Sequence, residues 1–264
     1  MKKIFTALAL TLASACVGQA QLIITGTTYS QNFNSLGTTA AATLPSGWKI
    51  EATAAGTDTA YASLETATTA AYGTSGAGVV TSSSGGAAVN WANGITGSST
   101  DRALGILNSG SFTTGKSIEF GVTNNTGFEI SSFTLGWDYE KYRSGTRAWT
   151  WNFYTSTDGV AWTAVTDGNQ AYAADANNTT VSNPPTTISK GFDINGLSIA
   201  DGASYYFRWT LVGTGGSSNG QGLAIDNFTF AATTVVPEPT TSAMILGGIG
   251  MMVWVLRRKR AVQA

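Results

Sequence analysis

The chain has 264 residues with 14 basic and 15 acidic side chains, a net charge of −1, no histidine and one cysteine. The missing histidine excludes Ser-His-Asp and Cys-His catalytic triads, histidine-ligated zinc and two-histidine iron sites. Charged residues make up only 11% of the chain and aromatic residues another 11%, which indicates an extracellular type of β-domain with enough aromatic side chains for a core.

The first 20 residues have the three parts of a secretory signal peptide. Lys2 and Lys3 form the positive region, residues 4–17 are apolar, and Gly18-Gln19-Ala20 places small residues before a cleavage site. We predict that the mature chain begins near Gln21 and therefore has no cysteine, disulfide or thiol chemistry. The alternative is a lipoprotein signal in which Cys16 is the acylated residue.

The mature chain is acidic. Between Gln21 and Val236 there are 8 basic and 14 acidic residues, a net charge of −6. This balance argues against nucleic acid and against anionic membrane surfaces as partners.

Residues 21–232 are predicted to form one extracellular β-sandwich, resembling a jelly roll in architecture. Aromatic and apolar residues alternate with polar ones, and turn residues separate the segments, whereas no stretch shows the spacing of an amphipathic helix. Residues 52–100 hold few large apolar side chains and are expected to form long loops with one or two weak strands. The expected strands are 23–33, 117–122, 132–139, 149–153, 162–165, 187–194, 205–209 and 223–230, and the expected turns are 124–127, 156–159 and 200–202.

Few charged residues are available for chemistry. Asp138 and Glu140 are two apart, so on a strand they share a face, as a glycosidase acid pair would. Because Lys141, Arg143 and Arg147 follow closely, ion pairing is the simpler interpretation of Glu140.

Asp101-Arg102 and Arg208 stand out in a chain with few charges, and a buried arginine needs a carboxylate partner. Glu140 and Asp226 are the partners we consider for these arginines, and a ligand clamp is the functional alternative.

Two further sites are candidates for binding. Asp226 lies in the last strand, where it could approach asparagines of the first strand, and such oxygen ligands suit a structural calcium ion. Trp91, Trp149 and Tyr154 are candidates for a sugar-stacking platform, although aromatic residues at a period of two are mostly core. No catalytic residue and no cofactor other than calcium is predicted.

The C-terminal residues 233–264 have the parts of a membrane-sorting segment. Pro237-Glu238-Pro239 is followed by 14 uncharged, mostly apolar residues, 243–256, and then by the basic cluster Arg257, Arg258, Lys259 and Arg260. A helix of that length spans about 21 Å at 1.5 Å per residue, short of the roughly 30 Å hydrocarbon core, so it suits a temporary anchor. The positive-inside rule predicts that the basic cluster stays cytoplasmic as a membrane stop. An ordinary single-span anchor is the alternative.

This order of motif, helix and arginine cluster resembles the PEP-CTERM sorting signal of Gram-negative bacteria. The resemblance implies recognition of Pro237-Glu238-Pro239 by an exosortase, a membrane protease-transpeptidase, and an association with exopolysaccharide and biofilm matrix.

The β-domain itself resembles a domain that recurs in secreted PEP-CTERM proteins, and this resemblance implies a sandwich and brings no established activity. The sequence departs from that domain's pattern at Asn227 and at Gly220-Gln221, where a second Asp and an Asp-His pair are more usual. The departure weakens a metal or acid–base role for this closing loop. The resemblance rests on Asn32 to Leu36 with Pro45 to Trp48, Thr100 to Gly105, Asn125 to Gly127, Glu140 with Arg143, Arg208-Trp209, and Gly222 to Phe228.

From these features we expect an exported, non-enzymatic protein of the cell envelope or extracellular matrix, structural or adhesive, with polysaccharide as its candidate ligand. The precursor would be anchored in the inner membrane and then displayed at the cell surface or in the matrix. A jelly-roll glycoside hydrolase and a ligand-free surface spacer remain the alternatives.

Overall fold

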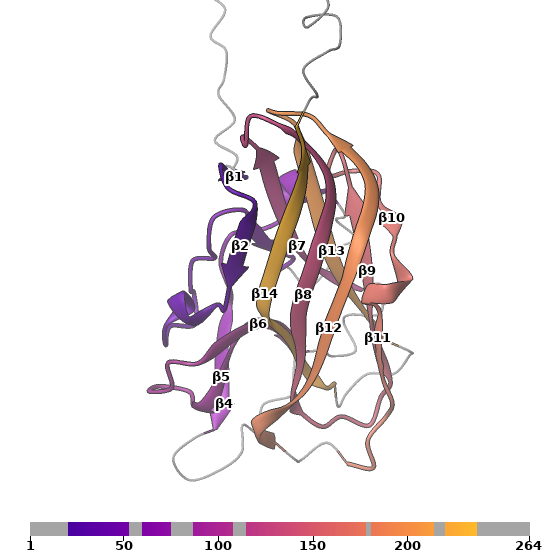
Figure 1. Cartoon of the computed structure of the whole chain (residues 1–264). Coiled ribbons are helices and arrows are strands. Elements are labelled where there is room, and N and C mark those ends of the chain that lie inside the picture. Colours follow the sequence, from indigo (N-terminus) through magenta and orange to yellow (C-terminus); the bar gives the residue numbers. More distant parts are fainter. Residues whose placement is uncertain are drawn as a thin grey trace, which may run out of the picture.

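The computed structural model describes residues 21–52, 60–74, 87–107, 115–177, 181–213 and 220–236. These residues form two facing β-sheets, and the described helical turns are three short 3-10 turns, η1 (Asn34–Leu36), η2 (Tyr61–Ser63) and η3 (Thr166–Gly168) (Figure 1). The predicted all-β, jelly-roll-like sandwich is therefore confirmed.

Sheet A has the strand order β1-β7-β13-β9-β10, with β3 also paired to β7 and β11 to β9. Its strands are β1 (Leu22–Ile24), β3 (Trp48–Ile50), β7 (Lys116–Asn124), β9 (Trp149–Ser156), β10 (Thr163–Ala164), β11 (Gln170–Tyr172) and β13 (Ser204–Gly213).

Sheet B has the order β12-β8-β14-β6-β5-β4, with β2 also paired to β14. Its strands are β2 (Thr28–Gln31), β4 (Ala70–Thr74), β5 (Ala87–Ile95), β6 (Arg102–Leu107), β8 (Glu129–Arg143), β12 (Val181–Ile199) and β14 (Gly222–Val235).

The core between the sheets is largely aromatic, as the alternation predicts. Trp137 of β8 meets Trp209 of β13 edge to face with ring centroids 5.4 Å apart, and Phe133 meets Phe207 across the same interface at 5.4 Å. Each such pair contributes about 0.5–1.5 kcal/mol to stability, beyond what the burial of its apolar surface contributes. The core can therefore be stable without a disulfide.

The prediction of one strand over residues 23–33 is wrong. The chain instead makes β1, parallel to β7 in sheet A, then turns at residues 25–27 and continues as β2, antiparallel to β14 in sheet B. Gly26 lies in this turn, and a glycine inside an apparent strand often marks such a break.

Residues 52–100 contain more regular structure than their composition suggests. β5 has nine residues, and with β6 it contributes to a second apolar cluster on the outer face of sheet B. Small residues make this possible: Gly105 of β6 lies against Ala224 of β14, and a side chain there would collide with β14. The cluster comprises Val89, Trp91, Ala103, Leu107, Tyr142 and Ala224.

The three predicted turns are present, each with a glycine at positive φ, a conformation that glycine adopts without steric cost. These glycines are Gly127 (φ 79°), Gly159 (φ 70°) and Gly202 (φ 80°).

Candidate functional site

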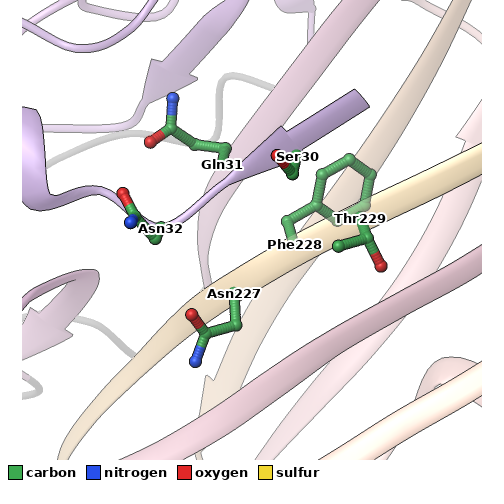
Figure 2. A pocket seen from close by; sticks show the side chains of 6 residues that line it. All are labelled: Ser30, Gln31, Asn32, Asn227, Phe228 and Thr229. Carbon is green, nitrogen blue, oxygen red and sulfur yellow. The ribbon is translucent and has the colours of Figure 1, made fainter. Parts of the chain in front are cut away.

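The outer face of sheet B carries two adjoining hollows of about 330 and 430 Å³ along β2 and β14. The hollows share Ser30 and Thr229, so together they form one shallow depression, which we call the polar trough. Its lining is uncharged and rich in hydroxyl and amide groups. The first hollow, shown in Figure 2, is lined by Ser30, Gln31, Asn32, Asn227, Phe228 and Thr229, and the second by Thr28, Tyr29, Ser30, Thr134, Leu135, Thr229, Phe230 and Ala231.

A β-bulge in β14 shapes the trough. Asp226 pairs with Asp138 of β8, but the next pair is Thr229 with Gly136, so Asn227 and Phe228 together oppose one residue. Asn227 adopts φ 50°, a left-handed conformation that asparagine tolerates better than most residues. As a result Phe228 enters the core, where it is fully buried, while Asn227 stays at the surface.

The side chain of Asn227 is fixed by Asp138. Its Nδ2 donates to Asp138 Oδ2 over 2.9 Å, and Ser189 of β12 donates its hydroxyl to Asp138 Oδ1 over 2.5 Å. Since a carboxylate only accepts, the amide nitrogen of Asn227 must face Asp138. Three neighbouring strands thus hold one carboxylate and orient one amide at the end of the trough.

At the end of β2, a tight turn orients the side-chain amides of Gln31 and Asn32. Gln31 Oε1 accepts the backbone N–H of Phe33 over 2.7 Å, and Asn32 Oδ1 accepts the N–H of Asn34 over 3.2 Å. The amide nitrogen of Asn32, a donor, is therefore left for other partners, and Figure 2 shows Asn32 on the β2 side of the hollow and Asn227 on the β14 side. This mixture of neutral donors and acceptors suits an uncharged, hydroxyl-rich ligand.

Two carboxyl groups lie beneath this face, next to the polar trough. Burial raises the pKa of Glu140 to about 7, despite a hydrogen bond of 2.5 Å from the Tyr142 hydroxyl to its Oε2. Burial likewise raises the pKa of Asp226 to about 8, although its Oδ1 accepts the N–H of Asn227 over 2.7 Å. The nearby acids Asp101 and Asp138 add to both shifts. Both carboxyls therefore hold a proton over much of the neutral range.

For Glu140 we expect an ion pair with one of Lys141, Arg143 and Arg147, and Lys141 is not that partner. Lys141 instead pairs with Asp175 over 2.7 Å, while Glu140 accepts from Tyr142. Strand alternation explains this, because Lys141 points to the face opposite Glu140.

Arg208 lies on the outer face of sheet A, with its guanidinium carbon 4.5 Å from the Tyr154 ring centroid and 4.4 Å from that of Trp162. The electrostatic partners of this guanidinium include Glu119 of β7 and Glu51, which directly follows β3 of the same sheet. Glu140 and Asp226, which we considered as partners, lie on sheet B.

The three predicted sugar-stacking residues lie in three different places. Trp149 is a core residue with 2% of its surface exposed, and Trp91 is 1% exposed and stacks on Tyr142 in the second cluster. Their placement does not present a ring face at the surface. Tyr154 is partly exposed on sheet A, but one face of its ring is against Arg208.

Among the described residues, no group of three or more Asp, Glu, Cys or His side chains is arranged to hold a metal ion. The calcium proposed for Asp226 stays a prediction. The sorting residues Pro237, Glu238 and Pro239, the basic cluster 257–260 and the predicted membrane helix lie outside the described residues. No helix in the part of the chain that is described reaches the length and hydropathy needed to span a membrane.

The polar trough itself was not predicted from the sequence. A signal was present at Asp226-Asn227, because an asparagine followed by Phe228 interrupts the alternation of the last strand and marks a bulge. The pairing of this segment with residues 28–31, almost 200 residues earlier, leaves no local signal.

Several solved structures are distantly similar to this chain. The K1 cleaved adhesin domain of Lys-gingipain (Kgp) from Porphyromonas gingivalis W83 is 14% identical, with 79% of this chain and 99% of that one covered and a TM-score of 0.40. The CBM22-1 xylan-binding domain of Paenibacillus barcinonensis Xyn10C is 12% identical, with 82% and 99% covered and a TM-score of 0.32. No curated protein matches the sequence.

The model of one family, described as the PEP-CTERM protein-sorting motif, matches residues 235–260. The match covers Pro237-Glu238-Pro239, the apolar run and the basic cluster in the order that the sequence analysis describes. The chain therefore carries a PEP-CTERM protein-sorting motif over residues 235–260.

Proposed function

We propose that the protein is an exported, non-enzymatic component of the cell envelope or extracellular matrix, structural or adhesive, that an exosortase-type membrane protease sorts. The observation that carries this proposal is the match of the sorting motif at residues 235–260, which begins at the last residue of the last strand of the sandwich. The precursor is held in the inner membrane, and processing releases it to the surface or the matrix.

The chemistry of the motif supports this role. Pro237 and Pro239 lack amide donors and favour an extended segment around Glu238, which presents a carboxylate and accessible peptide bonds to a protease outside the bilayer. The basic cluster 257–260 fixes the depth of the apolar run from the other side.

The test replaces Pro237-Glu238-Pro239 with three alanines in a host that carries the matching exosortase. Export and membrane insertion should be unchanged, while the full-length precursor accumulates in the inner membrane and surface display is lost. Replacing Thr240 and Thr241 with alanine is the matched control, which should be processed normally. If the triple-alanine variant is processed at the wild-type rate, the sorting hypothesis is wrong and residues 233–264 act as an ordinary membrane anchor.

We further propose that the sandwich binds a neutral polysaccharide in the polar trough. The observation behind this is the uncharged lining of hydroxyl and amide groups along β2 and β14, with Asn227 held in place by Asp138. A hydroxyl-rich chain would exchange hydrogen bonds with these groups without the cost of burying a charge. This proposal moves the binding site from the three aromatic residues of the sequence analysis to the outer face of sheet B.

Affinity electrophoresis against soluble neutral glycans tests this proposal. Thr229→Val removes a hydroxyl, and Asn227→Gly removes the amide while keeping the left-handed backbone. Both variants should lose the retardation of the wild-type protein. Thr150→Val, on the outer face of sheet A, is the matched control and should be retarded normally. No retardation of the wild-type protein by any glycan would favour the ligand-free spacer.

The glycoside hydrolase alternative is tested on the same glycans. Glu140 and Asp226 are buried, at 7% and 3% exposure, and both oxygens of Asp138 are engaged by neighbouring strands. These positions favour structural roles for the carboxyls over attack on a glycosidic bond. Release of new reducing ends, abolished by Glu140→Gln, would establish the hydrolase instead.

A further inference from the structure

Exposed apolar side chains gather at one end of the sandwich. Six large apolar residues are exposed among the described ones, and five of them lie at the end where β14 finishes. We call these five the apolar rim. They are Ile23 (61% exposed), Phe128 (41%), Val160 (65%), Val235 (46%) and Val236 (64%); the sixth, Ile95, lies at the end of β5.

Strand pairing places the rim residues at a common end. Val235 pairs with Glu129, so Phe128 in the β7–β8 turn lies next to the last residues of β14. Ile23 of β1 pairs with Thr123 near the end of β7, and it lines a hollow of about 440 Å³ together with Val160. Figure 1 shows β1 and the end of β14 at the same, upper end of the molecule.

This is also the end from which the sorting segment leaves. The matched motif begins at Val235, which is still paired in β14, so only Val236 separates the sandwich from Pro237. A chain extends by at most about 3.5 Å per residue, so the motif begins within a few ångströms of the rim. Only six residues, 237–242, lie between Val236 and the apolar run 243–256, and they span at most about 21 Å at about 3.5 Å per residue.

We propose that the apolar rim contacts the headgroup region of the bilayer while the precursor is anchored. This inference rests on the proposed anchoring of residues 235–260. Apolar side chains at the end of a tethered domain gain free energy from leaving water at the lipid interface. The exposed charged residues near the rim, Glu129, Asp158 and Asp201, are acidic, which points to zwitterionic rather than anionic lipid.

The rim would also orient the sandwich. With the rim on the membrane, the strands stand upright and the outer face of sheet B, with its polar trough, stays open to the side. The opposite end, which includes residues 173–177 after β11, then points away from the bilayer.

The experiment uses residues 21–264, which contain no cysteine, reconstituted in phosphatidylcholine vesicles that contain a headgroup nitroxide lipid. A fluorophore is attached to Thr25→Cys in the exposed β1–β2 turn, or to Ala174→Cys at the opposite end. We expect strong quenching at position 25 and little at position 174. The double substitution Ile23→Ser and Phe128→Ser should remove much of the quenching at position 25, whereas the matched control Ile95→Ser should not.

Each other outcome contradicts the proposal in a distinguishable way. If the protein does not float with the vesicles, both the anchoring and the rim contact are overturned. Flotation with equal quenching in the double-serine variant would overturn the rim contact alone, because the tether then suffices. If that variant keeps its quenching but is processed more slowly in cells, the rim contacts the protease rather than lipid.

Discussion

Neutralising Asp226 should flatten the dependence of stability on pH. An aspartate in an unfolded chain titrates near 3.9, whereas burial raises the pKa of Asp226 to about 8 in the folded protein. Between these values the folded state holds a proton that the unfolded state has lost. The contribution to stability is therefore complete below about pH 4 and is lost progressively as the pH rises toward 8.

The size of the effect follows from the proton difference. One proton changes the free energy of unfolding by about 1.4 kcal/mol per pH unit, so Asp226 alone removes roughly 3 kcal/mol between pH 5 and pH 7. Glu140, with its pKa raised to about 7, acts in the same direction over a narrower window. These are large effects for a protein whose total stability is typically about 5–15 kcal/mol.

Urea denaturation of the wild-type protein and of Asp226→Asn at pH 5, 6, 7 and 8 measures the difference. Asparagine keeps the oxygen that accepts the Asn227 N–H, so the variant should be more stable than the wild type at pH 8 and should lose less stability between pH 5 and pH 7. Asp193→Asn on exposed β12 serves as the control and should keep the wild-type slope. If the free energy of unfolding changes with pH equally in the wild type and in Asp226→Asn, the inference that the buried Asp226 carboxyl is protonated is wrong.

Further perturbations test the packing and the mature ends. Trp209→Ala should destabilise the sandwich by about 3–5 kcal/mol by opening a cavity among the core rings, measured by chemical denaturation; a loss below about 1 kcal/mol would contradict the packed core. Arg208→Lys should lower the melting temperature, because lysine cannot stack its head group between Tyr154 and Trp162, and an unchanged melting curve would argue against that contact. The secreted protein should melt identically with and without reductant, and a reductant-dependent shift would show that Cys16 is retained.

The sequence predicted those parts of the fold that have a strong local signal. Phe133, Leu135, Trp137 and Tyr139 alternate with polar residues, and the structure buries all four on the core face of β8. Large side chains at a period of two permit only one orientation of the strand, because a shift by one residue would expose every ring to solvent.

Other parts were beyond such local reasoning. β6 is buried on both faces, so Arg102–Leu107 does not alternate, and its partner Ala224 is distant in sequence. The polar trough depends on the pairing of β2 with β14, and the raised pKa values of Glu140 and Asp226 depend on burial that only the folded sandwich creates. The sorting segment shows the opposite case, because its signal is a short linear order of motif, apolar run and basic cluster.

The sorting proposal is tested most directly by the intact mass and terminal sequences of the protein isolated from the surface of its native host. It predicts an N-terminus at Gln21 and a C-terminus between residues 235 and 256, so that the basic cluster 257–260 is absent from the mature chain. A surface protein that still ends at Ala264 would contradict sorting by cleavage, and an acylated N-terminal Cys16 would contradict the predicted signal peptide.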